Sequence, residues 1–280
     1  MNFAKTILPS LLVLISLKLS AQIVLNTPGI NSQLFVGESV HQPLIVGLGG
    51  SEGGNAWASD YWKATRDEFL KRGYAFLALG YFGAKGTPDT LDRIAIDGVY
   101  NAIIMATENA LIDKNKIAIV GGSRGGDLAL LLGSYYPEIT CVVAIVPSHV
   151  SFPGHTNHFS TSCWSFQGKA LPFVPVSEAA VEPLIQGDLR TTFEVMLQDT
   201  LAEQKALIQV EKINGAVLLL SAKKDEIAPT TMMAEKMMAR LESHKFRYPH
   251  EHIAFEGGHT EPLKHFDLIF EFLEKYYLKK

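Results

Sequence analysis

The sequence predicts an α/β fold, with a mostly parallel central sheet and helices on both of its faces. Two observations lead to this prediction. From residue 43 onward, short apolar runs of strand length alternate with stretches of helical periodicity, which is the pattern of βαβ units. The chain has 280 residues, of which 47% are hydrophobic and 19% charged, so residues 22–280 can form one large domain around a substantial core.

The predicted elements follow one another along the chain. Each core strand is a short, nearly continuous apolar run, as expected of a strand that is covered on both faces. Residues 22–40 are expected to add one or two short antiparallel strands at an edge of the sheet. The predicted core strands are 43–47, 74–79, 117–120, 141–146, 216–221 and 252–255, and the predicted helices are 58–71, 91–109, 127–134, 230–243 and 261–277.

The alternation of strands and helices fails over residues 149–200. This segment lies between two core strands and holds several histidine, aromatic and proline residues. An insertion of this kind is expected to form a lid or pocket wall, or a structural excursion packed on the surface. Its aromatic residues favour the first alternative, with an apolar substrate pocket.

A serine lies at a sharp turn between a predicted strand and a predicted helix. The apolar run 117–120 breaks into Gly-Gly-Ser-Arg-Gly-Gly, and a helical stretch follows from Asp127. This order is the context of a nucleophile elbow, in which the Ser123 hydroxyl stands above the edge of the sheet. Glycine is expected at 121 and 125 because a Cβ there would clash with the strand and helix that the turn joins. An ordinary Gly-rich turn is the alternative.

A serine nucleophile needs a neighbouring base, and the base needs a carboxylate that orients it. The α/β-hydrolase fold presents these groups in the chain order Ser, Asp or Glu, and His. Asp225 follows the predicted strand 216–221 and therefore lies at the carboxyl edge of the sheet, where ligands bind; Glu226 beside it is the alternative acid. Among nine histidines, His259 lies in a Gly-rich loop directly after the last predicted strand. We expect Ser123, Asp225 and His259 to form a triad.

Two groups of backbone N–H donors are expected to stabilise the oxyanion. The N–H of Arg124 lies at the N-terminus of the helix that follows the elbow. The Gly-rich loop Gly47–Gly54 follows a core strand, and its many glycines allow several N–H groups to converge. Ser51 is the expected second donor, with Gly50 and Glu52 as alternatives.

Residues 1–21 have the pattern of a secretory signal peptide. Lys5 provides a basic start, the stretch 6–17 is apolar, and Ala21 offers a small residue at a cleavage position. The apolar stretch is too short to span a bilayer as a helix. A mature chain that begins near Gln22 and is secreted or periplasmic is therefore expected, with a buried N-terminal strand or helix as the alternative.

Charge and cysteine content limit the classes of partner. The formal net charge is −4 and the sequence has no basic stripe with interleaved aromatic residues, so no nucleic-acid partner is expected. Cys141 and Cys163 lack C-x-x-C spacing, which argues against a metal site, and their pairing as a disulfide stays open. No membrane span, metal ion or organic cofactor is expected, and the sequence does not indicate the oligomeric state.

The chain resembles the C-terminal catalytic domain shared by acyl-CoA thioesterases and bile acid-CoA:amino acid N-acyltransferase. The similarity extends from about residue 43 to the end and implies the same triad of Ser123, Asp225 and His259. The matching motifs are Gly49–Gly54, Leu77–Gly83, Gly121–Gly126, Val142–Ser148, Trp164–Val174, Ile213–Leu220 and Gly257–Pro262.

These observations predict an exported serine hydrolase that cleaves a small-molecule acyl ester or thioester through an acyl-enzyme. The family acts largely on CoA thioesters inside cells, so the expected export argues against carrying the CoA substrate over to this chain. An acyltransferase that passes the acyl group to an amine is the first alternative. A non-catalytic binding protein with the same fold is the second.

Overall fold

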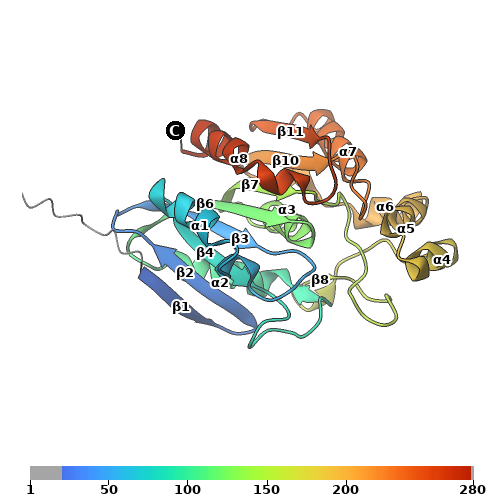
Figure 1. Cartoon of the computed structure of the whole chain (residues 1–280), viewed down its shortest axis with the longest axis horizontal. Helices are drawn as coiled ribbons and strands as arrows, with labels where there is room; N and C mark the ends of the chain where they lie inside the picture. The colour runs from blue at the N-terminus through green and yellow to red at the C-terminus, as the bar shows by residue number, and fades with distance from the viewer. Residues whose placement is uncertain (1–20, 279–280) are drawn as a thin grey trace, which may run out of the picture.

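A computed structural model describes residues 21–278. Within this range, the centre of the molecule is an eight-stranded sheet in the order β1-β2-β4-β3-β6-β7-β10-β11 (Figure 1). The pairs β1–β2 and β2–β4 are antiparallel, and every further pair is parallel. The predicted mostly parallel sheet with an antiparallel edge is therefore confirmed. Residues 1–20, which carry nearly all of the expected signal segment, lie outside the described residues.

The core strands overlap the predicted apolar runs, although β6 begins at Ile112, five residues before its predicted start. Every residue of β4 and β10 is buried. Strands β5, β8 and β9 form a separate small sheet. The bounds are β1 Ala21–Thr27, β2 Ile30–Val36, β3 Gln42–Leu48, β4 Ala75–Gly80, β5 Ile94–Ala95, β6 Ile112–Gly122, β7 Ile139–Ile145, β8 Trp164–Phe166, β9 Lys169–Ala170, β10 Ala216–Ala222 and β11 His250–Phe255.

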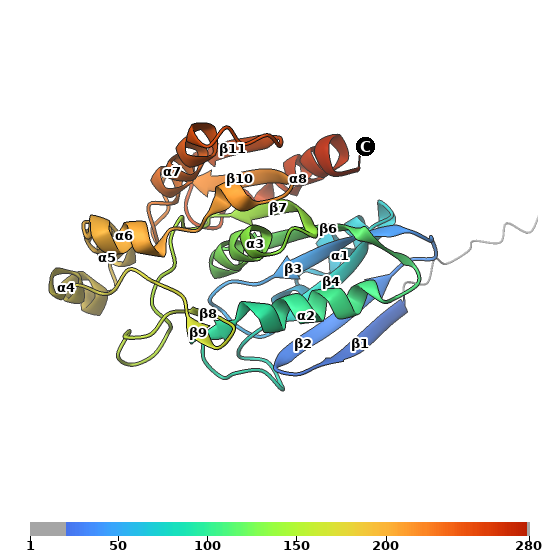
Figure 2. The same ribbon diagram turned by 180° about the vertical axis from the view of Figure 1, so that it is seen from behind.

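Helices cover both faces of the sheet. Helices α2, α3 and α7 contribute buried residues to the core on one face, and α1 and α8 to the core on the other (Figures 1 and 2). The bounds are α1 Lys63–Lys71, α2 Ile96–Thr107, α3 Arg124–Tyr135, α4 Glu178–Gln186, α5 Leu189–Met196, α6 Thr200–Ala206, α7 Thr230–Ser243 and α8 Phe266–Leu273.

Three predicted helices are shorter than expected. The helix predicted over residues 91–109 is α2, Ile96–Thr107, because residues 94 and 95 belong to β5. The helix predicted from residue 58 begins at Lys63, because residues 56–58 form a separate 3₁₀ turn. The helix predicted over residues 261–277 is divided into a 3₁₀ turn, α8 and a final π-helical turn. No helix within residues 21–278 combines the length and the apolar character required to cross a bilayer.

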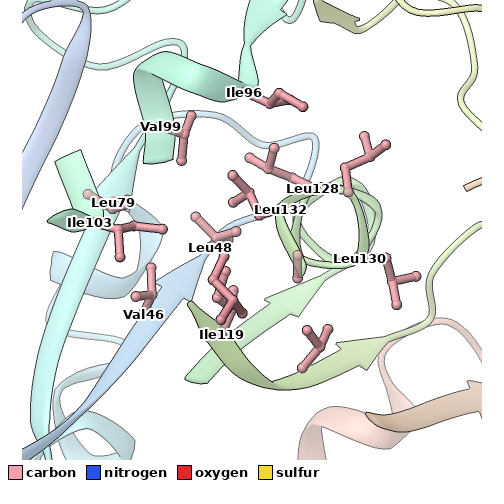
Figure 3. Packing of buried hydrophobic residues seen from close by; sticks show 14 of the residues in the cluster. Val46, Leu48, Leu79, Ile96, Val99, Ile103, Ile119, Leu128, Leu130 and Leu132 are labelled. Atoms are coloured by element: carbon pink, nitrogen blue, oxygen red, sulfur yellow. The ribbon is translucent and has the colours of Figure 1, made fainter. Parts of the chain in front are cut away.

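Helix α3, which begins at the elbow, is held by the core. Its residues from Arg124 to Gly133 are all buried. Figure 3 shows Leu128 and Leu132 of α3 beside Leu48 of β3, within the larger hydrophobic cluster. Burial of one such leucine side chain contributes about 1.5–3 kcal/mol. The start of α3 is therefore fixed against the end of β3.

The carboxyl ends of the parallel strands present their loops at one edge of the sheet. The loop that begins at Gly49 follows β3, and Ser123 follows β6. Ser148, Asp225 and His259 come after β7, β10 and β11. Residues that are far apart in the sequence are thereby brought to the edge at which sheets of this type bind ligands.

The segment predicted as an insertion is more regular than expected. It carries β8, β9, α4 and α5, and α6 begins at its last residue, Thr200. Helices α4 to α6 project from one side of the sheet in Figures 1 and 2. Asp188 and Asp199 cap α5 and α6 by accepting the N–H groups of Thr191 and Ala202. Gly187 ends α4 with a φ of 77°. The insertion is thus built from helices with local start and stop signals.

Both cysteines are free and buried. Cys141 belongs to β7 in one hydrophobic core, and Cys163 packs in the core on the other face of the sheet. Burial raises the pKa of the Cys163 thiol to about 11. The structure therefore contains no disulfide between them.

Candidate active site

Ser123 lies at a strained turn between β6 and α3. Its φ of 52° and ψ of −122° place a non-glycine residue in a region that L-amino acids rarely adopt. The Ser123 N–H donates to the carbonyl oxygen of Ile145 at 2.8 Å, and its own carbonyl accepts the N–H of Gly126 at 2.8 Å. These bonds hold the strained residue at the junction of two core strands and a helix, as backbone strain at a functional site requires.

The two glycines that flank the turn are required by close backbone contacts. A Cβ on Gly121 would lie 2.0 Å from the carbonyl oxygen of Gly125, at the start of α3. A Cβ on Gly125 would lie 2.3 Å from the Gly49 carbonyl oxygen and 2.6 Å from that of Leu48. The expectation at Gly121 is correct. At Gly125 the predicted neighbour was wrong, because the clash involves β3 and its following loop rather than the strand that the turn joins.

Asp225 and His259 are hydrogen-bonded. Nδ1 of His259 lies 2.9 Å from both carboxylate oxygens of Asp225. An ionised carboxylate only accepts, so Nδ1 carries the proton and Nε2 is left as an acceptor. The imidazole is thus fixed in the tautomer that can remove a proton from a hydroxyl group.

The Asp225 side chain is fully buried, and both of its carboxylate oxygens accept hydrogen bonds. Oδ1 accepts the N–H groups of Ile227 at 2.9 Å and Ala228 at 3.2 Å, and Oδ2 accepts the Thr230 hydroxyl at 2.8 Å. Burial raises the pKa of Asp225, but the hydrogen bonds and the His259 imidazole outweigh it and hold the pKa below its ordinary value. Asp225 is therefore a carboxylate at neutral pH.

Glu226, the alternative acid, has a different position. Its carboxylate accepts the backbone N–H of His259 at 2.9 Å rather than the imidazole. It lies so close to the loop that a Cβ on Gly258 would be 2.6 Å from Oε2 of Glu226. Glu226 therefore holds the backbone that carries His259, while Asp225 contacts the ring.

Ser123 and His259 line one large cavity, with a volume of about 950 Å³. No hydrogen bond joins the Ser123 hydroxyl to the His259 imidazole within the part of the chain that the structure describes. In unliganded sites such a bond is often long and tightens only when substrate binds. Ser123 and His259, the predicted nucleophile and base, thus line the same cavity. The expected hydrogen bond between them is not formed in this structure.

Two predicted oxyanion donors line the same cavity. Neither the Arg124 N–H nor the Ser51 N–H donates a hydrogen bond within residues 21–278. By contrast, the Gly50 N–H donates to Oε1 of Glu52 at 3.0 Å. The Gly50 donor is therefore already occupied, and Arg124 and Ser51 have free donors.

Gly50 also lies close to Ser123. A Cβ on Gly50 would lie 3.1 Å from Cβ of Ser123. The preceding carbonyl, of Gly49, accepts the Tyr81 hydroxyl at 2.6 Å. Since the carbonyl and N–H of a trans peptide point in opposite directions, Tyr81 fixes the direction of the Gly50 N–H.

The insertion supplies one wall of the cavity. Its lining residues from this segment are mainly apolar, and they are Pro153, His155, Thr156, Asn157, Phe159, Val176, Leu184, Leu189, Thr192, Phe193 and Met196. The other walls come from the loops after β3, β6, β7, β10 and β11, together with Trp57 and Trp62. Some aromatic residues on which the pocket prediction rested do not line the cavity. Trp164, for example, packs in the hydrophobic core against the sheet.

Several contacts around the site have no signal in the local sequence pattern. Tyr81 donates to the Gly49 carbonyl in the loop predicted to hold an oxyanion donor, and Thr230 donates to the carboxylate of Asp225. Arg190 of α5 donates to the backbone carbonyl of Asp225 at 2.7 Å and so ties the insertion to the acid loop. Only Tyr81 could have been suspected, because it follows β4 at the carboxyl edge of the sheet.

Comparison with protein families identifies one match over more than half of the chain. Residues 100–262 match the family described as "BAAT / Acyl-CoA thioester hydrolase C terminal". The matched segment includes Ser123, Asp225 and His259. The resemblance inferred from the sequence motifs is therefore confirmed.

Curated relatives include both hydrolases and a transferase. Acyl-coenzyme A thioesterase 1 of Rattus norvegicus is 27% identical over 188 residues, which are 67% of this chain and 42% of the relative. Mitochondrial acyl-coenzyme A thioesterase 2 of Homo sapiens is 26% identical over 190 residues, covering 67% and 37%. Acyl-coenzyme A amino acid N-acyltransferase 1 of Mus musculus is 24% identical over 174 residues, covering 61% and 38%. The chain thus spans less than half the length of these relatives.

Solved structures share the fold. An esterase of Pyrococcus furiosus superposes with a TM-score of 0.61 at 15% identity, covering 93% of this chain and 94% of the other. An acylaminoacyl peptidase of Pyrococcus horikoshii superposes with a TM-score of 0.67 at 13% identity, covering 93% and 42%. These similarities confirm the predicted α/β-hydrolase fold.

Proposed function

Because the chain belongs to the BAAT / acyl-CoA thioester hydrolase C-terminal family, we propose that it is a serine hydrolase acting on an acyl ester or thioester. The observation that carries this proposal is the hydrogen bond between Asp225 and Nδ1 of His259, in a cavity that Ser123 also lines. These groups follow β10, β11 and β6 at one edge of the sheet. They provide the acid, base and nucleophile that acyl transfer requires.

The first half of the proposed reaction forms an acyl-enzyme. Nε2 of His259 removes the proton of the Ser123 hydroxyl as the serine oxygen attacks the substrate carbonyl carbon. His259 then gives that proton to the departing alcohol or thiol, and the bond between the acyl carbon and the leaving group breaks. Asp225, ionised and fully buried, stabilises the imidazolium that exists between these two transfers.

The free backbone N–H of Arg124 is the best-placed donor for the oxyanion. It belongs to the first residue of α3, so the helix dipole adds to the hydrogen bond. We propose Ser51 as the second donor. Use of the Gly50 N–H instead would require the Glu52 carboxylate to move away, since that carboxylate accepts the bond in this structure.

The second half releases the acyl group. In the hydrolase, a water molecule attacks the acyl-enzyme, its proton passes to Nε2 of His259, and Ser123 regains its proton as the free acid leaves. In an acyltransferase, an amine takes the place of water. The similarity to a relative named as an amino acid N-acyltransferase supports this second candidate function.

We further propose that the protein is exported. This part rests on the sequence pattern of residues 1–21, namely a basic start, a short apolar stretch and a small residue before Gln22. Export would place the enzyme away from the intracellular CoA pool. Oxygen esters and non-CoA thioesters are then the preferred substrates to examine.

Product analysis tests the proposed reaction. The purified protein is given acyl-CoA thioesters and para-nitrophenyl esters of matched acyl chains, with and without an excess of amino acids. A hydrolase yields free acid in both conditions, whereas an acyltransferase yields the amide when the acceptor is present. Absence of any acyl-group release from the whole panel would favour a non-catalytic binding protein instead.

A further inference from the structure

The wall of the active-site cavity contains a buried cation that the proposed reaction does not use. The side chain of Arg124, the residue directly after Ser123, is 9% exposed, and Arg124 is one of the residues that line the cavity. Its backbone N–H has a place in the mechanism above, but its guanidinium does not. A guanidinium held in a largely apolar cavity is costly unless its N–H groups find acceptors.

Only one of the hydrogen-bond donors of this guanidinium has a partner within the described residues. One nitrogen, Nη1, donates to Oδ2 of Asp127 at 3.0 Å, and no other hydrogen bond from the group is made to any residue in the described range 21–278. The rings of Phe152 and Phe193 lie 5.1 and 5.5 Å from its Cζ atom. Arginine presents a fork of N–H donors that suits a carboxylate, so most of this fork remains available.

The partner of Arg124 is already fully engaged. Oδ1 of Asp127 accepts the N–H of Ser148 at 2.6 Å, and Oδ2 accepts from Arg124. Burial raises the pKa of Asp127 to about 6, so it is ionised at neutral pH and holds the guanidinium in place. Asp127 thus orients the guanidinium but accepts a hydrogen bond from only one of its nitrogens.

Two other features of the surroundings favour an anion. Arg124 is the first residue of the twelve-residue helix α3, whose N-terminus carries a partial positive charge. His155 lines the same cavity. Burial and, to a smaller extent, the Arg124 cation lower the pKa of His155, so it is a neutral hydrogen-bonding group at pH 7. Resting on the function proposed above, we infer that Arg124 binds a carboxylate carried by the acyl part of the substrate.

The assignment to the acyl part follows from the direction of the reaction. The leaving group must receive its proton from Nε2 of His259, so it lies on the side of the loop after β11. The guanidinium instead packs against Phe152 and Phe193, both of which belong to the insertion between β7 and β10. We therefore assign the acyl chain to the part of the cavity beside Arg124 and Phe193, both of which line it.

Matched esters test this inference. The first pair is para-nitrophenyl hydrogen suberate and its methyl ester, which differ only in whether the far end of the acyl chain is a carboxylate. The second pair is the hexanoate of para-hydroxybenzoate and that of methyl para-hydroxybenzoate, which moves the carboxylate to the leaving group. The ratio of kcat/KM within each pair is measured for the wild type, Arg124→Gln and the control Arg247→Gln. Arg247 is exposed and lies outside the cavity lining.

The wild type is expected to favour the acid in the first pair by about 10- to 100-fold, the range of a charge-assisted hydrogen bond, and to show no preference in the second. Arg124→Gln should bring the first ratio to near one, and Arg247→Gln should leave it unchanged. A wild-type ratio near one in the first pair overturns the inference, even if Arg124→Gln does not fold. The inference is also overturned if folded Arg124→Gln keeps the wild-type preference for the acid in the first pair. It is overturned as well if the wild type prefers the acid only in the second pair, where the carboxylate is on the leaving group.

The same assay separates this inference from the proposed function. If the neutral esters are cleaved and a fluorophosphonate probe labels Ser123, the hydrolase proposal stands whatever the ratio. If no ester is cleaved and Ser123 is not labelled, the hydrolase proposal fails first.

Discussion

Nδ1 of His259 lies 2.9 Å from each carboxylate oxygen of Asp225, across 34 positions of sequence. The relationship depends on β10 and β11 being parallel neighbours, because their carboxyl ends then bring the two following loops together. Glu226 adds a second bond, to the His259 backbone, at 2.9 Å. The ring and the backbone of one histidine are thus held by two adjacent acidic residues.

The two acids should differ sharply when each is neutralised. Asp225→Asn is expected to lower kcat by about 10⁴-fold, because an amide donates to Nδ1 and favours the wrong tautomer. Glu226→Gln should cost about tenfold or less, because it weakens one bond to the backbone of the loop. Steady-state kinetics on a para-nitrophenyl ester measure both. A larger loss in Glu226→Gln than in Asp225→Asn would show that the acid is misassigned.

Tyr81 should act through the oxyanion loop. Tyr81→Phe removes the bond to the Gly49 carbonyl, and kcat is expected to fall by about tenfold with little change in KM, since the Gly49–Gly50 peptide next to the proposed Ser51 donor loses its fixed direction. Tyr74→Phe is the matched control, because the buried Tyr74 hydroxyl has no hydrogen-bond partner within residues 21–278. Equal kinetics for the two variants would refute a positioning role of Tyr81.

Asp127 should leave a signature in the pH dependence of stability. Burial raises its pKa from 3.8 to about 6, so between these values the folded state binds more protons than the unfolded state. Its contribution to stability therefore decreases as pH rises through this window, by about 1.4 kcal/mol for each unit of pKa difference, and is constant above it.

Urea unfolding of the wild type and Asp127→Asn across pH 4 to 7 measures this effect. The stability of the wild type relative to the variant is expected to fall from about pH 4 to about pH 6. Asp267→Asn, at an exposed position, controls for the change in net charge. Parallel stability curves for the wild type and Asp127→Asn would contradict the assignment.

The location and the first residue of the recovered protein test the proposed export. Expressed with residues 1–21 in a host with a secretory pathway, the protein should be recovered outside the cytoplasm with Gln22 as its first residue. A substitution of Ala21 by a large charged residue should reduce cleavage. Recovery from the cytoplasm with residues 1–21 intact would argue against the signal assignment.

The fold could be predicted because its signals are local. Each core strand is a short apolar run, and α7 over Thr230–Ser243 has the bounds that its periodicity indicates. The insertion was harder, because α4 to α6 are short and their pattern is interrupted, as at Pro183 inside α4. Their capping residues, Asp188 and Asp199, are visible in the sequence only once the helices are known.

The site could be predicted as far as chain order determines it. Ser123, Asp225 and His259 each follow a core strand, and parallel strands bring such positions to one edge. The occupation of the Gly50 N–H by Glu52 depends on a side-chain rotamer in a loop, which no sequence periodicity encodes. The packing of Arg124 between Asp127 and two aromatic rings of the insertion likewise depends on tertiary structure.

Covalent labelling together with ester hydrolysis decides whether Ser123 is the nucleophile. Wild type, Ser123→Ala and Ser123→Gly are treated with a fluorophosphonate probe and assayed on a para-nitrophenyl ester; glycine accepts the φ of 52° at this position without strain. We expect labelling of Ser123 in the wild type, and a loss of at least about 10³-fold in kcat for both folded variants. Hydrolysis by either variant at the wild-type rate would contradict it.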